Sequence, residues 1–448
     1  MSKINDLRSA IEYLKTVDGQ LVQTDTEVDC HGELAGVYRH IGAGGTVKRP
    51  TKIGPAMIFN KIKGHKDAKV AIGILASRER VGMLLDCKPD RLGFLLCDAV
   101  KNPIEPVVIK NEDAKCQEVV HYADEEGFDI RKILPAPTNT LEDAGPYITL
   151  GMCYASDHET MEGDVTIHRL CLQSKDELSM FFTPGVRHLD AFRKKAEESG
   201  QPLPISISIG VDPAIEIAAC FEPPTTPLGF NELSIAGAIR KRPVEMVKCI
   251  TVNEKAIANA EYVIEGELIP HKRIREDFNS NTGKAMPEFP GYTGEANKEL
   301  PIIKVKAVTH RKNPIMQTCI GPSEEHVSMA GIPTEASIIG MIEKAMPGRL
   351  INVILVDEDV DIFDSNDVLW ALNTRYQGDI DTICIPGVRC HPLDPSQSSS
   401  YSPFIRDGGI SCKTIFDCTV PYDLKDKFIR SKFMDVDLDK FDIKPLNK

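Results

Sequence analysis

The sequence lacks the features that mark membrane, secreted and nucleic-acid-binding proteins. None of its apolar runs reaches the length of a membrane span. Its first 17 residues are amphipathic, with Leu7, Ile11 and Leu14 on one helical face, and have no apolar core of the kind found in a signal peptide. The formal net charge is −13, and no basic cluster offsets it. We therefore expect neither a membrane nor a nucleic-acid partner.

Paired cysteines and a phosphate loop are also missing. The thirteen cysteines are scattered without a C-x-x-C pair, which in a long chain is typical of a reducing cytoplasm rather than of a disulfide framework. The glycine turn GAGGT (Gly42–Thr46) lacks the G-x-x-x-x-G-K-[ST] pattern of a P-loop. It is either a plain turn or a place where the backbone approaches a ligand.

Length and residue patterns predict several domains of mixed secondary structure. A chain of 448 residues is expected to form two or three domains. In residues 1–110 helices and strands are mixed, with a helix expected over 76–86. Residues 111–320 are rich in β-branched runs (147–155, 164–173, 204–212, 302–310) and predict an antiparallel, barrel-like sheet. In residues 321–448 a helix over 334–348 capped by Thr334, a strand over 351–356 and a helix over 365–377 predict an α/β domain.

Three polar residues in separate segments are candidate metal ligands. Asp164, His188 and Glu232 offer two carboxylates and one imidazole, a set that suits Mg²⁺ or Mn²⁺. No two of them are close in sequence, so ordinary structural pairing of these acids remains an alternative. Arg169 and Glu288 similarly form either an acid/base pair or a structural one. Because side chains alternate along a strand, Asp164 and Arg169 can line one site only if a strand end or a bulge re-aims one of them.

These residues lie in segments that resemble a known family. DVTIHRL, GVRHLD, FNELSIAGA and AMPEFPGY, between Asp164 and Tyr292, resemble in this order the UbiD-type decarboxylases, which use prenylated FMN. Further segments resemble the branch that acts on hydroxybenzoates: ELAGVYRHIGAGGTVKRPT, LPAPTNTLEDAGPYIT, GPSEEHVSMAGIPTEAS and the tail GISCKTIFDCTVPYDLK. The resemblance covers nearly the whole chain.

The resemblance implies a fold and an activity. The fold is α+β and multidomain: an N-terminal α/β domain (1–110), a flavin-reductase-like split β-barrel that binds prenylated FMN (111–320), and a linker helix with a C-terminal α/β dimerisation domain (321–448). The reaction is reversible, non-oxidative decarboxylation of 3,4-dihydroxybenzoate to catechol through a covalent adduct with the flavin. Gallate or another 4-hydroxybenzoate is the alternative substrate, and a non-catalytic structural paralogue is the alternative function.

The resemblance also implies roles for residues. Asp164, His188 and Glu232 match ligands of a Mn²⁺ or Mg²⁺ ion that, with K⁺ nearby, holds the flavin phosphate. Thr166, Ile167, Arg187 and His188 match cofactor-binding positions. The expected catalytic residues are Arg169 beside the reacting carbon, Glu288 as the proton donor, and His326 and His391 as partners of a substrate hydroxyl. A homo-oligomer (dimer or hexamer), and a flavin prenyltransferase as the cofactor supplier, are also implied.

The chain departs from the family in two places. A second glutamate of the family is missing, since Gly283 falls near its position, and either Glu276 or Asp277 is expected to replace it. Relatives also carry a few dozen residues, including a lysine that reaches the cofactor, where Val353 here runs directly into Ile354. We expect that residues are omitted at this point, so that the two residues lie farther apart than one peptide step of about 3.8 Å. A continuous chain would instead favour the structural paralogue.

Overall fold

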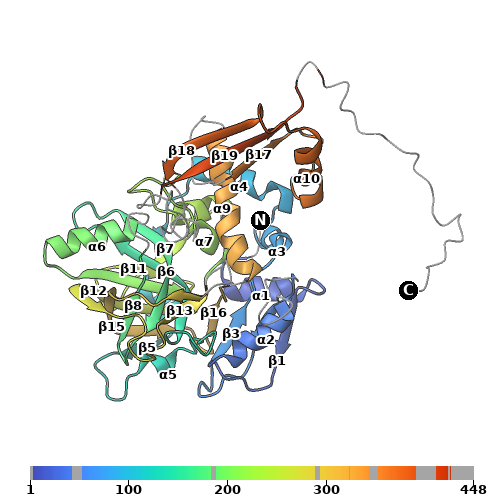
Figure 1. Cartoon of the computed structure of the whole chain (residues 1–448). Helices are drawn as coiled ribbons and strands as arrows, with labels where there is room; N and C mark the ends of the chain where they lie inside the picture. The colour runs from blue at the N-terminus through green and yellow to red at the C-terminus, as the bar shows by residue number, and fades with distance from the viewer. Residues whose placement is uncertain are drawn as a thin grey trace, which may run out of the picture. The chain divides into compact units, whose positions relative to one another are not determined.

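The computed structural model describes residues 4–42, 53–182, 188–223, 225–287, 293–321, 323–342, 352–389, 410–421 and 424 (Figure 1). The chain divides into two compact units, Met1–Met346 and Pro347–Lys448, and each is described by itself. No helix among these residues is long and apolar enough to cross a membrane.

The N-terminal part of the first unit is a four-stranded mixed sheet with helices packed around it. The strand order is β1 (Leu21–Thr24), β2 (Ala56–Phe59), β3 (Lys69–Ile72) and β16 (Ile315–Thr318), so the last strand comes from much later in the chain. Helix α1 (Leu7–Lys15) is capped by Asp6 and buries Leu7, Ile11 and Leu14, as its amphipathic pattern predicts. The helices that follow are α2 (Glu33–Gly42), α3 (Arg78–Leu84) and α4 (Leu92–Lys101). Helix α3 lies where a helix was expected, and most of the GAGGT turn lies outside the described residues.

A closed six-stranded barrel forms the centre of the first unit. Its order is β12 (Tyr262–Ile274), β9 (Leu203–Ile209), β6 (Tyr147–Ser156), β7 (Gly163–Leu172), β8 (Glu177–Met180) and β15 (Leu300–His310), and β15 pairs again with β12. All these pairings are antiparallel. The short strand β5 (Val119–Tyr122) is added beside β15. The expected barrel-like sheet is thus confirmed, and all four strands predicted from the sequence lie within it.

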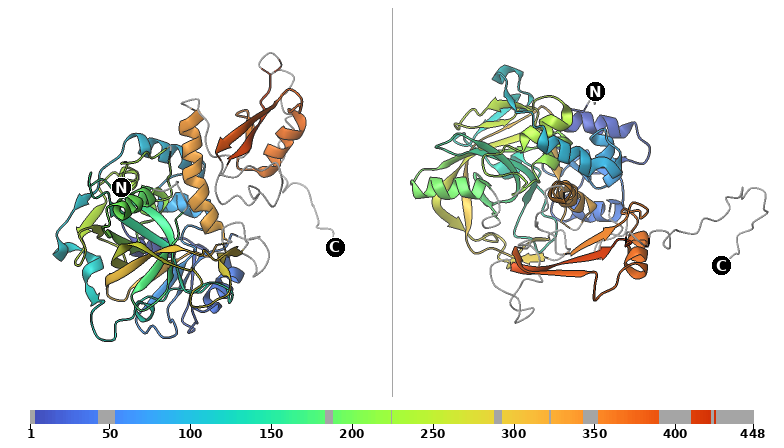
Figure 2. Two further views of the ribbon diagram at one scale, coloured as in Figure 1. Left: turned by 60° about the vertical axis from the view of Figure 1, so that its left-hand side comes forward. Right: turned by 90° about the horizontal axis from the view of Figure 1, so that it is seen from above.

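Apolar side chains form two large clusters around this barrel. One cluster includes Leu203, Ile205, Ile207 and Ile209 from alternate positions of β9, together with Leu189 and Phe192 of α6 (His188–Glu198). The other joins the barrel to α1, α3, α4, α7 (Pro213–Ala218), α8 (Leu233–Arg240) and α9 (Glu324–Ile342). Figure 2 shows α9 as a long helix that stands beside α4, against which it packs. The smaller elements are α5 (Ile130–Ile133), β4 (Val107–Val108), β10 (Glu245–Lys248), β11 (Lys255–Ile257), β13 (Lys284–Pro287) and β14 (Thr293–Glu295).

Helix α9 differs from its prediction. It begins at Glu324, ten residues before the predicted cap, and it continues through Pro333. Thr334 therefore lies inside the helix, where its hydroxyl donates to the carbonyl of Ala330 at 2.7 Å. The cap expected at Thr334 is wrong because a threonine after a proline resembles a helix start, while here tertiary packing extends the helix beyond the proline.

The second unit contains a three-stranded sheet and one helix. Strand β19 (Ile410–Cys418) lies between β17 (Asn352–Val356), which is parallel to it, and β18 (Thr382–Arg389), which is antiparallel. Helix α10 (Ser365–Thr374) is capped by Asp364 and packs against β17 and β19. The α/β pattern predicted for this part of the chain is confirmed.

Candidate metal centre and active site

The structure brings the three predicted metal ligands together. Asp164 is the second residue of β7, His188 is the first residue of α6, and Glu232 immediately precedes α8. One ligand atom from each lies within 4.8 Å of the other two, and all three side chains are buried. The amide of Leu233 is capped by the side chain of Asn231, so the Glu232 carboxylate is not needed as the cap of α8 and is directed into this cluster.

The atoms of this cluster have the chemistry of an ion site. Asp164 Oδ1, His188 Nε2 and Glu232 Oε2 are buried without a hydrogen-bond partner among the described residues. Burial and the nearby Asp164 charge raise the pKa of Glu232 well above its usual value. Buried polar atoms without partners are costly, and a divalent cation would satisfy all three. The residues present therefore fit a hard, divalent metal ion.

Three further residues of β7, Thr166, Ile167 and His168, differ in burial and in their contacts. The Thr166 hydroxyl is buried, and no residue in the described part of the chain is its partner. Ile167 is half-buried and packs against the cluster of barrel and helix residues described above. His168 lies 2.9 Å from the carbonyl of Phe181 through Nδ1 and packs against the Phe182 ring.

Arg169 is paired with Glu276. Arg169 Nε lies 3.1 Å from Glu276 Oε1 and Nη2 lies 3.2 Å from Oε2, a two-pronged contact, and the Arg169 guanidinium also lies over the Phe181 ring. The other candidate replacement, Asp277, contacts Arg275 and accepts from the amide of Gly283, which has a positive φ of 72°. Of the two alternatives left open by the sequence, Glu276 is the one that contacts Arg169.

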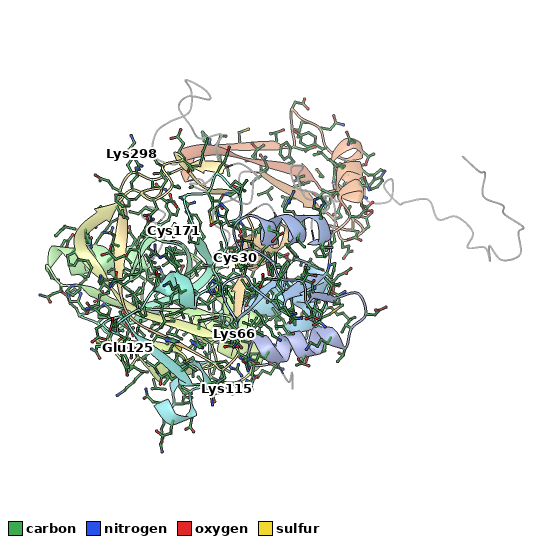
Figure 3. The ribbon with its side chains drawn as sticks, turned by 90° about the horizontal axis from the view of Figure 1, so that it is seen from below. Cys30, Lys66, Lys115, Glu125, Cys171 and Lys298 are labelled. Atoms are coloured by element: carbon green, nitrogen blue, oxygen red, sulfur yellow. The ribbon has the colours of Figure 1, made fainter. Side chains whose placement is uncertain are left out.

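The Glu276 carboxylate accepts three further hydrogen bonds. The Tyr147 hydroxyl donates to Oε1 at 3.0 Å, and the backbone and side-chain amides of Asn297 donate to Oε2 at 3.1 and 2.8 Å. Neither Tyr147 nor Asn297 was predicted from the sequence. Tyr147 belongs to a small apolar cluster beside this pair, together with Cys171, which Figure 3 labels. With five donors on two oxygens, Glu276 is suited to anchoring Arg169 and not to exchanging a proton.

Side chains alternate regularly between the two faces of β7. From Asp164 to His168 each residue pairs in turn with β6, so Asp164 and Arg169 are on opposite faces. The bulge lies in the partner strand: Thr149 and Leu150 of β6 stand opposite Arg169. At about 3.3 Å per residue, the Cα atoms of Asp164 and Arg169 are about 16 Å apart along the strand.

The other predicted residues either make separate contacts or lie outside the described residues. His326 is half-buried in the first turn of α9, with Nδ1 3.2 Å from the carbonyl of Gly321. Arg187, Glu288 and His391 lie outside the described residues. The pairing of Arg169 with Glu288 therefore stays a prediction.

Loss of Arg169 is expected to destabilise the fold. In Arg169→Ala the Glu276 carboxylate, 1% exposed, would keep only its Tyr147 and Asn297 donors, and breaking a buried pair in this way costs roughly 3 kcal/mol or more. Denaturant unfolding measures this loss. Lys63→Ala is the matched control, because Lys63 and its partner Asp29 are 66% and 40% exposed, and loss of such a surface pair should hardly change stability. Equal stability of the two variants would contradict the assignment.

Comparison with known proteins shows the family. The chain belongs to the UbiD family: the N-terminal domain of 3-octaprenyl-4-hydroxybenzoate carboxy-lyase matches residues 12–100, its Rift-related domain residues 107–324 and its C-terminal domain residues 336–418. The resemblance found in the sequence is thereby confirmed.

Three proteins are similar to this chain over nearly its whole length. The gallate decarboxylase of Lactiplantibacillus plantarum is 50% identical over 476 residues, which cover 96% of this chain and 97% of the relative. The apo structure of a 3,4-dihydroxybenzoic acid decarboxylase from Enterobacter cloacae is 55% identical, with a TM-score of 0.89 and coverage of 98% of this chain and 99% of that one. An evolved dimeric UbiD-class enzyme from Pelotomaculum thermopropionicum, in complex with prenylated FMN, is 28% identical with a TM-score of 0.79 and the same coverage.

In the structure all five residues of β17, Val353 and Ile354 included, pair in turn with successive residues of β19. The expectation that residues are omitted between Val353 and Ile354 stays a prediction. The alignment with the gallate decarboxylase spans 476 positions, more than the 448 residues of this chain, so that relative has residues that this sequence lacks.

Proposed function

We propose that this protein is a non-oxidative decarboxylase that converts 3,4-dihydroxybenzoate reversibly to catechol and CO₂. One observation carries the proposal: a buried cluster of Asp164, His188 and Glu232 with unpartnered ligand atoms stands five residues along one strand from Arg169 and its carboxylate partner. The similarity to gallate and 3,4-dihydroxybenzoic acid decarboxylases gives the substrate class.

The metal cluster suits the phosphate end of a flavin nucleotide. Asp164, His188 and Glu232 would hold Mn²⁺ or Mg²⁺, with K⁺ nearby, and Thr166, Ile167 and Arg187 would contact the cofactor. Asp164 lies near the end of β7, which would let a cofactor reach from the metal cluster on one face of the strand to Arg169 on the other, about 16 Å along it. When bound, prenylated FMN supplies the electron sink that a ring carbanion needs and that side chains do not provide.

The side chains have separate tasks in this proposal. Arg169, a permanent cation held by Glu276, orients the substrate carboxylate through bidentate contacts. Glu288 delivers the proton that replaces CO₂ on the ring carbon. His326 or His391 accepts the proton of a substrate hydroxyl and so increases the electron density of the ring.

Cofactor content tests the proposal most directly. The protein co-produced with a flavin prenyltransferase should carry a flavin-like absorbance and retain it through desalting. A colourless protein would instead support the structural paralogue, the second candidate, which the lack of the family's lysine segment in this sequence favours. We further propose a cytoplasmic homo-oligomer with the three domains 1–110, 111–320 and 321–448, in which the barrel is of the flavin-reductase-like split type and the last domain mediates dimerisation.

Substrate selectivity should follow the para hydroxyl. Loss of the para proton makes the ring quinoid in character and eases protonation of the carbon that bears the carboxylate, so 3,4-dihydroxybenzoate and gallate should react. 3-Hydroxybenzoate should be inert. Product formation from the three acids, measured by chromatography, decides this. Faster turnover of 3-hydroxybenzoate than of the other two acids would refute a hydroxyl-assisted reaction.

A further inference from the structure

Helix α7 carries a buried acid, Glu216, that has no role in the proposed reaction. Glu216 is almost completely buried, and its Oε2 accepts a hydrogen bond of 3.0 Å from the side-chain amide of Gln317 on β16. Its other oxygen, Oε1, is buried without a partner in the described part of the chain, and so is Oε1 of Gln317. The same two side chains thus make one hydrogen bond and each leave one acceptor unused.

A single proton on Glu216 Oε1 would pair the two unpartnered oxygens with each other. If Glu216 is a neutral carboxylic acid, its O–H donates to Gln317 Oε1 while the Gln317 amide N–H donates to Glu216 Oε2. An acid and an amide paired in this way satisfy each other's donors and acceptors. An ionised Glu216 would leave two buried acceptors facing each other at a high desolvation cost.

A neighbouring acid, Glu325 in the first turn of α9, has the opposite surroundings. Its two oxygens accept from the backbone amides of Gly73 and Leu75, each at 2.8 Å, and the Arg80 guanidinium lies nearby. Burial raises the pKa of Glu325 to about 7, and these donors keep it from rising further. Burial raises the pKa of Glu216 well above its usual value, and the charge of Glu325 adds to this effect. Both oxygens of Glu325 thus have donors, whereas only one oxygen of Glu216 has a donor among the described residues.

We propose that Glu216 is held as a neutral acid paired with Gln317, and that this uncharged pair is a pH-sensitive contact that joins α7 to β16 beside the first turn of α9. Helix α7 packs on α9, and that turn carries His326 next to Glu325. The charged groups that face Glu216 are Glu325 from α9 and Asp212 at the start of its own helix, and both disfavour its ionisation. Ionised Glu216 would repel Glu325 and loosen this turn.

The dependence on pH has a definite sign. The folded-state pKa of Glu216 lies above its unfolded value, so its contribution to stability is complete at low pH and is lost as the pH rises toward the folded pKa. Glu216→Gln replaces the acid by an amide that keeps both hydrogen bonds to Gln317 and cannot ionise. The matched variant Glu325→Gln replaces one acceptor oxygen by an amide donor that faces a backbone N–H.

Thermal unfolding of the full chain without substrate tests the proposal. At pH 4, below the usual pKa of a glutamate, Glu216→Gln should melt within about 2 °C of wild type, and at pH 9 it should melt several degrees higher. Glu325→Gln should melt below wild type at both pH values. In the infrared difference spectrum at pH 8, the carbonyl band of a protonated carboxylic acid should be lost in Glu216→Gln.

Three outcomes would overturn the proposal: failure of Glu216→Gln to fold, a lower melting temperature than wild type at pH 9, or an unchanged acid band. The experiment measures neither flavin nor activity, so its failure would leave the proposed decarboxylase untouched. Only the link to His326 rests on that proposed function.

Discussion

Replacing His188 with alanine is expected to remove the metal and the flavin together. The imidazole is one of three ligands, and the two that remain are acids whose charges repel each other in a buried site. Metal affinity should fall by at least about 10²-fold, since even residues behind the ligands contribute 10–100-fold. The flavin should be lost as well, because the metal joins its phosphate to the protein. Metal analysis and flavin absorbance of the desalted variant measure both losses.

His158→Ala is the control for this experiment. His158 is exposed and lies 3.9 Å from Glu159, so its removal should leave metal and flavin content unchanged. Retention of flavin at wild-type occupancy in His188→Ala would sink the proposed link between the metal and the cofactor.

Glu288→Gln is expected to lower turnover by roughly 10²-fold or more while leaving the fold and cofactor content unchanged. The amide has nearly the same shape as the acid but cannot deliver a proton, and a positioned acid usually contributes this much to the rate. Single-turnover measurement of product under saturating substrate isolates the chemical step.

The matched variant is Glu299→Gln, an exposed glutamate of the same region. It should decarboxylate at the wild-type rate. Since both oxygens of Glu276 are occupied by hydrogen-bond donors, we do not expect Glu276 to substitute for Glu288. A wild-type rate in Glu288→Gln would show that the proton comes from another group.

Local patterns in the sequence predicted the strands but not the contacts between distant segments. The β-branched runs predicted four of the six barrel strands, since alternation is a property of each strand alone. The residue types gave the ligand set of Asp164, His188 and Glu232, and family resemblance rather than spacing favoured it over structural pairing. The closure of the barrel through β12 and β15 follows from a pairing that neither strand's pattern encodes.

The partner of Arg169 was harder to predict for a related reason. Glu276 and Asp277 are adjacent acids, and only the turn that begins after β12 decides which of them faces the barrel. Tyr147 reads as an ordinary aromatic strand residue, and Asn297 as an ordinary loop residue. Their shared role as donors to Glu276 exists only when three separate segments meet.

The separation of Arg169 and Glu276 by 107 positions also affects how the protein folds during its synthesis. Contacts between distant positions form slowly, because the intervening chain must first be ordered. A nascent chain that has emerged only as far as β9 holds Arg169 on β7 without its carboxylate, and the seam between β12 and β15 cannot form before Leu300–His310 has been made. The charged pair thus completes late, so that premature termination anywhere before β15 leaves a chain with an open barrel edge.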